Sequence, residues 1–207
     1  MLEVKSFVFG PFQTNTFVVR DESHVLLIDP ACSNEYEQQQ LLNYISNLKP
    51  PFSDIQIVAT HGHLDHLWGA KWATEQWHTP VLMHEADIPM AKAMQSQYDL
   101  FGIRMKAEPF EIKGIQSTDR FTDRMQTDLQ IIETPGHTQG SVCLYFPKDK
   151  VLISGDTLFQ MGYGRTDLPG GNIGQLIDSL QRLFDLAPDV RVYPGHGEPT
   201  TIGAERR

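Results

Sequence analysis

The chain has 207 residues, with 17 basic against 26 acidic side chains and a formal net charge of −9. Hydrophobic residues make up 40% and charged residues 21%, proportions of a folded globular protein that exclude an intrinsically disordered chain. The acidic balance, without a basic stripe, argues against a nucleic-acid partner, and no apolar run is long enough to span a membrane.

The length predicts one domain over residues 1–207, because a chain of this size buries a sizeable core without dividing. The N-terminal stretch Met1–Lys5 lacks the basic-then-apolar pattern of a signal peptide. The two cysteines, Cys32 and Cys143, have no metal-type spacing and are too few for a disulfide framework. We therefore expect a reduced, cytoplasmic setting.

The first part of the chain predicts a hairpin, a strand and a helix, in that order. Residues 2–9 and 12–20 alternate apolar and polar side chains, and the apolar strand 25–29 ends in an aspartate. A helix is expected from about Glu35 to Leu48, stopped by Pro50-Pro51.

The most informative motif, Thr60-His61-Gly62-His63-Leu64-Asp65-His66, follows a predicted strand at 55–60. It places three imidazoles and one carboxylate in six consecutive positions. Imidazoles have little reason to crowd together unless a cation lies between them, and both residue types are ligands of divalent metals. The motif therefore predicts a metal site at the end of a strand.

The middle of the chain predicts two helices, 69–77 and 85–97, separated by a short strand at 80–83. The methionines of the second helix have core spacing and indicate packing. The segment 99–117 has weak periodicity, which is compatible with a lid over the site or with a surface loop.

The second half repeats the plan of the first: hairpin, strand with an acidic end, helix, strand and histidine. Its predicted elements are strands 140–146 and 150–154, a helix at 173–186 and a strand at 190–193. Two such units are expected to pack sheet on sheet with helices outside. This is an α/β protein with a four-layer αβ/βα sandwich, in which the metals lie at the shared edge of the sheets.

Three further ligand candidates, His137, Asp156 and His196, stand at the ends of apolar, strand-like runs. Glycine or proline flanks each of them, as in the sequence Pro194-Gly195-His196-Gly197. Loops held by a rigid sheet are where functional residues gather. We therefore expect these three side chains to join the histidine motif.

On these motifs the chain resembles the metallo-β-lactamase-fold superfamily, in particular its short glyoxalase II-like (hydroxyacylglutathione hydrolase-like) subgroup. The motif residues occur in the family's order across nearly the whole length, namely Asp29, His61, His63, Asp65, His66, His137, Asp156 and His196. Gly155-Asp156-Thr157-Leu158-Phe159 resembles hydroxyacyl-thiol hydrolases. Gly164-Arg165-Thr166-Asp167 is shared with persulfide dioxygenases and with small glyoxalase II-like hydrolases.

The resemblance implies a binuclear centre, with two zinc ions per chain or with iron or manganese in their place. One metal would be bound by His61, His63 and His137, and the other by Asp65, His66 and His196. Asp156 would bridge the two metals, and Asp29 would support the metal-binding loops. The implied enzyme is a metal-dependent thioester hydrolase. A metal-bound hydroxide attacks a small acyl-thiol such as a hydroxyacyl-glutathione, and Asp65 and Asp156 are the catalytic carboxylates.

Two alternatives to hydrolysis remain open. A mononuclear-iron persulfide dioxygenase would use His61, His137 and Asp156, although Tyr163 replaces the cysteine usual in those enzymes. The other is a non-catalytic metal-binding domain.

The substrate is also left open in part. Only eleven residues follow His196, so we expect no helical C-terminal domain of the full-length glyoxalase II type. The site should then be more open, and its preference for glutathione modest. Arg165 is expected either to pair with Asp167 or to hold a substrate carboxylate.

Overall fold

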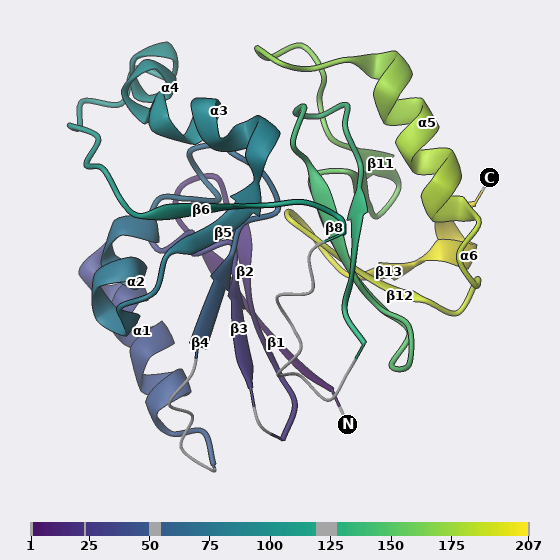
Figure 1. The fold of residues 1–207 in the computed structure, drawn as a ribbon, viewed down its shortest axis with the longest axis horizontal. Helices are drawn as coiled ribbons and strands as arrows, with labels where there is room; N and C mark the ends of the chain where they lie inside the picture. The colour runs from purple at the N-terminus through teal and green to yellow at the C-terminus, as the bar shows by residue number, and fades with distance from the viewer. Residues whose placement is uncertain (1, 23, 50–54, 119–127, 207) are drawn as a thin grey trace.

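The computed structural model describes residues 2–22, 24–49, 55–118 and 128–206. Two β-sheets pack face to face, and helices cover their outer faces (Figure 1). The predicted four-layer sandwich is therefore confirmed. The predicted helix stop at Pro50-Pro51 lies outside the described residues. No helix in the described part of the chain is both long and apolar enough to cross a membrane.

The first sheet has the strand order β1-β2-β3-β4-β5-β6. Its strands are β1 Glu3–Phe9, β2 Thr14–Arg20, β3 Val25–Ile28, β4 Ile55–Val58, β5 Val81–His84 and β6 Ile112–Ile115. β1, β2 and β3 pair antiparallel, whereas β3 to β6 pair parallel. The loops that follow the parallel strands consequently lie at one edge of the sheet, where α/β proteins commonly place their sites.

The second sheet has the order β13-β12-β9-β8-β7. Its strands are β7 Gln130–Glu133, β8 Val142–Phe146, β9 Val151–Gly155, β12 Arg191–Pro194 and β13 Thr200–Thr201. A separate small hairpin is made by β10 Leu158–Phe159 and β11 Gly162–Tyr163. β9 and β12 are parallel, so the loops after them meet at one edge.

The two sheets repeat one connectivity, as the sequence predicts. Three antiparallel strands are followed by a helix and by a strand parallel to the third, in β1-β2-β3-α1-β4 and again in β7-β8-β9-α5-β12. The helices α1 Glu35–Ser46 and α5 Ile173–Phe184 also begin with the same type of N-cap residue, an asparagine. Asn34 and Asn172 accept a hydrogen bond from a backbone N–H of the first turn, which satisfies a group left free at every helix start.

The core has three apolar layers, and β3 shows how the sequence builds them. Leu26 and Ile28 point between the sheets, while Val25 and Leu27 point toward α1 and the neighbouring helices. The second sheet likewise contributes Leu144 to the space between the sheets. Because alternate strand residues face opposite sides, a strand covered on both faces is apolar throughout.

The predicted helix over 85–97 is wrong as a single element. The chain forms a 3-10 turn, Glu85–Asp87, then α3 Ile88–Lys92 and α4 Met94–Leu100, with a break at Ala93. The break lets Gln97 reach back, where its Nε2 donates to the carbonyls of Met90 (3.1 Å) and Gly62 (3.0 Å). Tertiary contacts with the histidine motif therefore override the local helical pattern.

The segment 99–117 is more than a surface loop, and its Phe101 lines the cavity over the cluster. It contains the end of α4 and then β6, an edge strand that pairs with β5 from Val81–Ile112 to His84–Ile115. Only Ile115 of this strand is fully buried, which explains why its pattern is weak. The other predicted elements are present with ends shifted by one or two residues, including α2 Ala70–Trp77.

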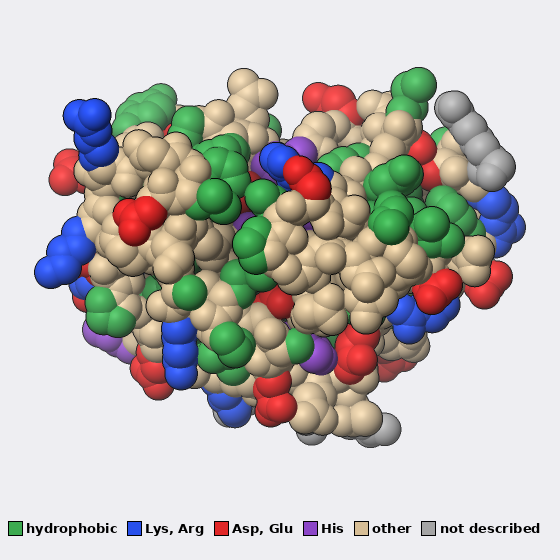
Figure 2. All heavy atoms as spheres, turned by 90° about the horizontal axis from the view of Figure 1, so that it is seen from above, with side chains coloured by type: hydrophobic (Ala, Val, Ile, Leu, Met, Phe, Trp, Pro, Cys, Tyr) green, Lys and Arg blue, Asp and Glu red, His purple; other side chains and the backbone are tan. Residues whose placement is uncertain are grey.

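The short elements β10, β11, β13 and α6 Ile202–Glu205 were not predicted. They are too short to carry a periodic pattern. Seen from the side on which α3 and α4 lie, the molecule is hollowed between its two halves, and histidine side chains are visible in the hollow (Figure 2).

Candidate metal centre

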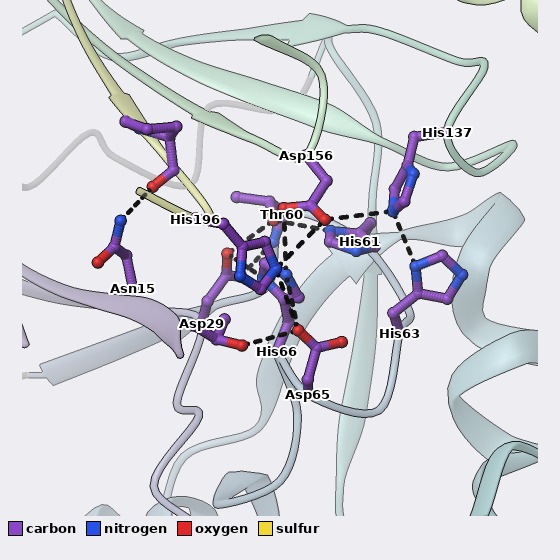
Figure 3. A network of polar contacts seen from close by, with 12 residues as sticks. Asn15, Asp29, Thr60, His61, His63, Asp65, His66, His137, Asp156 and His196 are labelled. Carbon is purple, nitrogen blue, oxygen red and sulfur yellow. Dashed lines mark hydrogen bonds and ion pairs between the residues drawn. The ribbon is translucent and has the colours of Figure 1, made fainter. Parts of the chain in front are cut away.

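The predicted ligand residues converge at the edge where the loops of both sheets meet (Figure 3). His61, His63, Asp65 and His66 lie on the loop after β4. The second sheet supplies the remaining residues, which are His137 after β7, Asp156 after β9 and His196 after β12. Neither half of the chain forms the cluster alone.

Asp156 lies between the other members of the cluster. Its Oδ1 is 3.3 Å from His66 Nε2, and its Oδ2 lies 3.5 Å from His137 Nε2 and 3.4 Å from His196 Nε2. His196 Nε2 is also 3.3 Å from Asp65 Oδ2. At the other end of the cluster, His63 Nδ1 is 2.8 Å from His137 Nε2. Each of these ring nitrogens therefore has another ligand-type atom of the cluster within 3.5 Å.

Asp29 fixes two of the histidines in the orientation that a metal ligand needs. It is fully buried, and its Oδ2 accepts hydrogen bonds from His66 Nδ1 (2.9 Å) and from the Thr60 hydroxyl (2.7 Å). Thr60 in turn lies 3.0 Å from His61 Nδ1 and, since its proton goes to Asp29, accepts from that nitrogen. Both rings therefore carry a proton on Nδ1, so that Nε2 faces the cluster and presents a lone pair whenever the ring is neutral.

His137 is held in the same way by the second half of the chain. Its Nδ1 lies 2.7 Å from the carbonyl oxygen of Arg165, which can only accept. The ring proton is thereby fixed on Nδ1, and Nε2 faces His63 and Asp156. Orientation of a ligand histidine by a hydrogen bond at its other nitrogen is a general feature of metal sites.

Three buried atoms of the cluster, His61 Nε2, His66 Nε2 and Asp156 Oδ1, have no hydrogen-bond partner. Leaving buried polar atoms unsatisfied costs about 1–3 kcal/mol each. All three point into the same cluster (Figure 3). A divalent cation is bound by nitrogen and oxygen atoms that point to one place and have no other partner. These residues therefore fit a metal.

The ligand-type atoms form two neighbouring groups that match the two implied metal positions. His61, His63 and His137 offer atoms within 4.8 Å of one another, as do Asp65, His66 and His196. A third group, made by His61, His66 and Asp156, connects them. Two adjacent ligand sets with a carboxylate between them are the arrangement of two-metal hydrolytic sites.

Two histidines of the first ligand set, His61 and His63, are neutral near pH 7. Burial lowers the pKa of His63 to about 4, and the neighbouring His137 acts in the same direction. Burial also lowers the pKa of His61 well below its usual value. These rings consequently offer lone pairs without first losing a proton.

The second ligand set has the opposite character. Burial opposes protonation of His196, but hydrogen bonds to Asp156 and Asp65 raise its pKa to about 9. The pKa of His66 is likewise raised well above its usual value. Burial lowers it, but the negative charges of Asp65 and Asp156 raise it by more. The pKa of Asp65 is lowered to about 2 in spite of burial, because His66 lies beside it and His196 hydrogen-bonds to it.

Polar residues at the start of β2, which the sequence analysis did not single out, tie the two halves together. The Thr14 hydroxyl donates to Asp65 Oδ2 at 2.7 Å. Asn15 Nδ2 donates to the carbonyls of Pro194 and Gly197, on either side of His196 (Figure 3). Both side chains are buried. The sequence does contain a sign of this role, because consecutive polar residues occur here in a strand that was expected to alternate polar and apolar side chains.

Asp87 is a second residue that sequence reasoning missed. It is 1% exposed, and it accepts hydrogen bonds from the backbone N–H of Gly62 (2.8 Å), the Thr138 hydroxyl (2.6 Å) and the Gly140 N–H (2.6 Å). One carboxylate thus links the histidine motif to the loop that carries His137. Its position inside an expected helix gave no sign of this role.

Gly195 is required by the close approach of the backbone to the cluster. A Cβ atom at this position would lie 2.2 Å from Asp156 Oδ1 and 2.7 Å from the His66 ring. Any side chain would therefore displace a ligand residue. The Gly-His-Gly sequence around His196 has a direct steric reason.

Arg165 pairs with Asp167, one of the two uses expected for it. Its Nε and Nη2 each donate to a carboxylate oxygen of Asp167 at 2.7 Å, and both side chains are exposed. Hydrogen bonding to Arg165 lowers the pKa of Asp167 to about 2. Arg165 also lines the small cavity over the cluster, so a substrate carboxylate would compete with Asp167 for it.

Comparison with known proteins identifies the family. The model of the Metallo-beta-lactamase superfamily matches residues 9–196. The chain belongs to this superfamily. The resemblance drawn from the motifs is thereby confirmed, and the matched range includes every residue of the cluster.

Individual members of the superfamily are similar over almost the whole chain. An uncharacterized protein of Aquifex aeolicus is 34% identical, over 98% of this chain and 93% of its own length. Hydroxyacylglutathione hydrolase GloC of Haemophilus influenzae is 32% identical, over 95% of this chain and 91% of its own. The solved structure of TTHA1623 in a di-iron-bound form has a TM-score of 0.84 and 32% identity, covering 99% of this chain and 98% of that one.

Together with the histidine and aspartate cluster, these matches show a metal-dependent hydrolase of the metallo-beta-lactamase superfamily. Its fold and its cluster of ligand-type side chains agree with that class.

Proposed function

We propose that this superfamily member is a binuclear metallohydrolase that cleaves thioesters such as a hydroxyacyl-glutathione. The observation that carries the proposal is the pair of adjacent ligand sets with Asp156 between them. The similarity to hydroxyacylglutathione hydrolase GloC of Haemophilus influenzae supports this substrate class.

In this proposal, the first metal is held by His61, His63 and His137, and the second by Asp65, His66 and His196. Asp156 is the shared ligand. Its Oδ2 lies within 3.5 Å of a ring nitrogen from each set, and its negative charge reduces the repulsion between two cations.

The bound cations would supply a water molecule with a strongly lowered pKa and a Lewis acid for the carbonyl oxygen. The protein's contribution is to orient three of the seven ligand side chains, His61, His66 and His137, through Thr60, Asp29 and the Arg165 carbonyl. Because each of these partners accepts a hydrogen bond from the Nδ1–H of its histidine, the Nε2 atoms are oriented before any ligand binds.

We propose Asp65 and Asp156 as the catalytic carboxylates. In this proposal Asp65 takes up the proton that the attacking water releases. Thr14 and His196 both contact its Oδ2, which directs the proton toward Oδ1. With a pKa of about 2, Asp65 would hold that proton only briefly and pass it to the departing thiolate.

A thioester is the favoured substrate because a thiolate is a good leaving group. The chain then needs to provide only an attacking water and stabilisation of the carbonyl oxygen. A β-lactamase must in addition stabilise an amide nitrogen as it leaves. We therefore expect hydrolysis of thioesters to be faster than that of β-lactams.

We propose zinc as the metal, since imidazole and carboxylate ligands suit it. Iron and manganese also suit such ligands, and the similar chain TTHA1623 has been solved with two irons.

We further propose that the chain works as one domain in the reducing cytoplasm. Phe17 and Val58 of the first sheet share a buried core with Leu144 and Ile153 of the second, which supports a single unit. Cys32 and Cys143 are free, buried thiols, in keeping with a reducing compartment.

The test is a spectrophotometric comparison of lactoyl-glutathione, a simple acyl-thiol and a chromogenic β-lactam, with oxygen uptake measured on glutathione persulfide. The proposal expects rapid cleavage of both thioesters, slow cleavage of the β-lactam and no oxygen uptake. Oxygen consumption without thioester cleavage would identify a persulfide dioxygenase. No turnover of any substrate by the metal-loaded protein would favour a non-catalytic domain.

A further inference from the structure

An apolar groove leads away from the metal cluster, between the helices α3 and α4 and the loop that contains Leu168 and Pro169. We call it the α3–α4 groove, and its apolar lining includes Met90, Ala93, Leu100, Phe101, Leu168 and Pro169. Its volume of about 370 Å³ lies in the range of small-molecule sites, roughly 300–1,000 Å³.

The groove is continuous with the reaction site. A smaller cavity of about 140 Å³ covers the cluster and contains Asp65, Asp156 and His196. Four residues line both spaces, namely His63, Gln97, Phe101 and Leu168. A substrate whose carbonyl reaches the cluster can therefore extend one arm directly into the α3–α4 groove.

The α3–α4 groove has no cationic side chain that would favour an anionic substrate arm. Among the described residues that line it, none is Lys or Arg, and the polar side chains are His63, Asp87, Ser96, Gln97 and Gln139. Asp87 is present in the lining, but both of its oxygens already accept hydrogen bonds from Gly62, Thr138 and Gly140. A carboxylate or phosphate would lose hydration there and would gain no cationic partner in return.

The apolar side chains at the rim are unusually accessible. Leu100 is 61% exposed and Phe101 is 39% exposed, next to a site made of charged and polar groups. Hydrophobic side chains gather beside the hollow in the surface view (Figure 2). Exposed apolar groups that surround a cavity mark a ligand-binding position.

We propose that the α3–α4 groove binds the acyl arm of the substrate and that this arm is an aliphatic chain of medium length. The proposal rests on the thioester hydrolysis proposed above. A thioester carbonyl has two arms, and biological thiol carriers are polar. The polar arm suits the side of Arg165, which lines the cavity over the cluster but not the groove.

Chain length should then control the rate. Each methylene buried in the groove is expected to raise kcat/KM about three- to fourfold until the groove is full. A hexanoyl thioester should accordingly be cleaved with a kcat/KM about a hundredfold above that of the acetyl thioester of the same thiol.

The test is to measure kcat/KM for acetyl, butyryl, hexanoyl and octanoyl thioesters of one small thiol with the metal-loaded protein. Ala93→Trp places a large ring in the groove, and Ala187→Trp is the matched control at an exposed alanine that lines neither space. The hexanoyl-to-acetyl ratio should fall at least about tenfold in Ala93→Trp and stay unchanged in Ala187→Trp. A ratio near one in the starting protein, or an equal loss in both variants, would overturn the proposal.

Binding of uncleavable analogues, in which a methylene replaces the sulfur, separates this inference from the proposed function. Calorimetry on the metal-loaded protein should show tighter binding as the acyl chain lengthens, and Ala93→Trp should weaken it. If the analogues bind in this way and no thioester is cleaved, the groove stands and the proposed function fails. If thioesters of all lengths are cleaved equally well, the groove inference fails and the proposed function stands.

Discussion

Two aspartates follow corresponding strands in the two halves of the molecule, yet their surroundings differ. Asp29, after β3, is fully buried and accepts hydrogen bonds from the Thr60 N–H, the Thr60 hydroxyl and His66. Asp156, after β9, has an oxygen without a hydrogen-bond partner and lies among three histidines. The first carboxylate is saturated by the protein, and the second is available to a ligand.

The backbone explains the difference. Each strand is followed by a left-handed turn, but the left-handed residue is Asp29 itself in the first half (φ 52°) and Gly155 in the second (φ 49°). Asp156 therefore stands one position further along than Asp29. A Cβ atom on Gly155 would come within 2.6 Å of the Thr60 hydroxyl, the group that Asp29 holds. The repeated unit thus places one aspartate behind the histidines and the other among them.

The largest effect is expected from Asp156→Ala. It removes the proposed shared ligand together with the charge between the cations, so both ions should bind weakly and turnover should fall to that of the metal-free protein. Metal content after dialysis and thioester cleavage measure this. A variant that keeps both ions and near-normal turnover would show that Asp156 is not shared.

Asp29→Asn tests the supporting aspartate. An amide nitrogen in the place of Oδ2 would donate toward His66 Nδ1, which moves the ring proton to Nε2 and removes the lone pair that faces the cluster. Metal affinity or activity should fall about 10–100-fold, less than for Asp156→Ala. Asp189→Asn, in an exposed pair with Lys150, is the control. An equal loss in Asp29→Asn and Asp156→Ala would contradict the distinction between the two aspartates.

Asp87→Asn tests a third aspartate, which links loops of both halves and is not a ligand candidate. In Asp87→Asn an amide NH₂ group replaces one acceptor oxygen, so it faces a buried donor that has lost its acceptor. The free energy of unfolding of the metal-free protein should therefore fall by about 1–3 kcal/mol. Urea unfolding measures this. The neighbouring Glu85→Gln, at an exposed position, should change it by less than about 0.5 kcal/mol. No difference between the two variants would refute the linking role.

The convergence of the cluster could be predicted from the sequence, because its members lie in the loops that follow apolar strands and are flanked by glycine, proline or another histidine. The sequence also predicted the repeated topology, since the buried strands alternate side chains between two apolar layers. Thr14 and Asp87 escaped notice because their partners lie 25 to 53 residues away in the chain. The break at Ala93 was missed for a similar reason, as it depends on contacts of Gln97 with the histidine loop.

The smallest expected effect is the pH dependence of metal affinity, which should differ between the two ligand sets. In the metal-free protein His196, with a pKa of about 9, is protonated at pH 7, whereas His63, with a pKa of about 4, is neutral. A metal needs neutral imidazole, so affinity at the second set should rise as the pH increases from 7 to 9, and affinity at the first set should stay nearly constant. Calorimetry in buffers of different ionisation enthalpy measures the protons released. Equal release from both sets would contradict this assignment.

We propose that both halves of the chain build one centre for two metals. Elemental analysis of protein purified without added metal tests it most directly, when thioester cleavage is measured on the same sample. We expect about two divalent ions per chain and an activity that appears with the second ion. A single iron per chain, with oxygen consumed and no thioester cleaved, would contradict it.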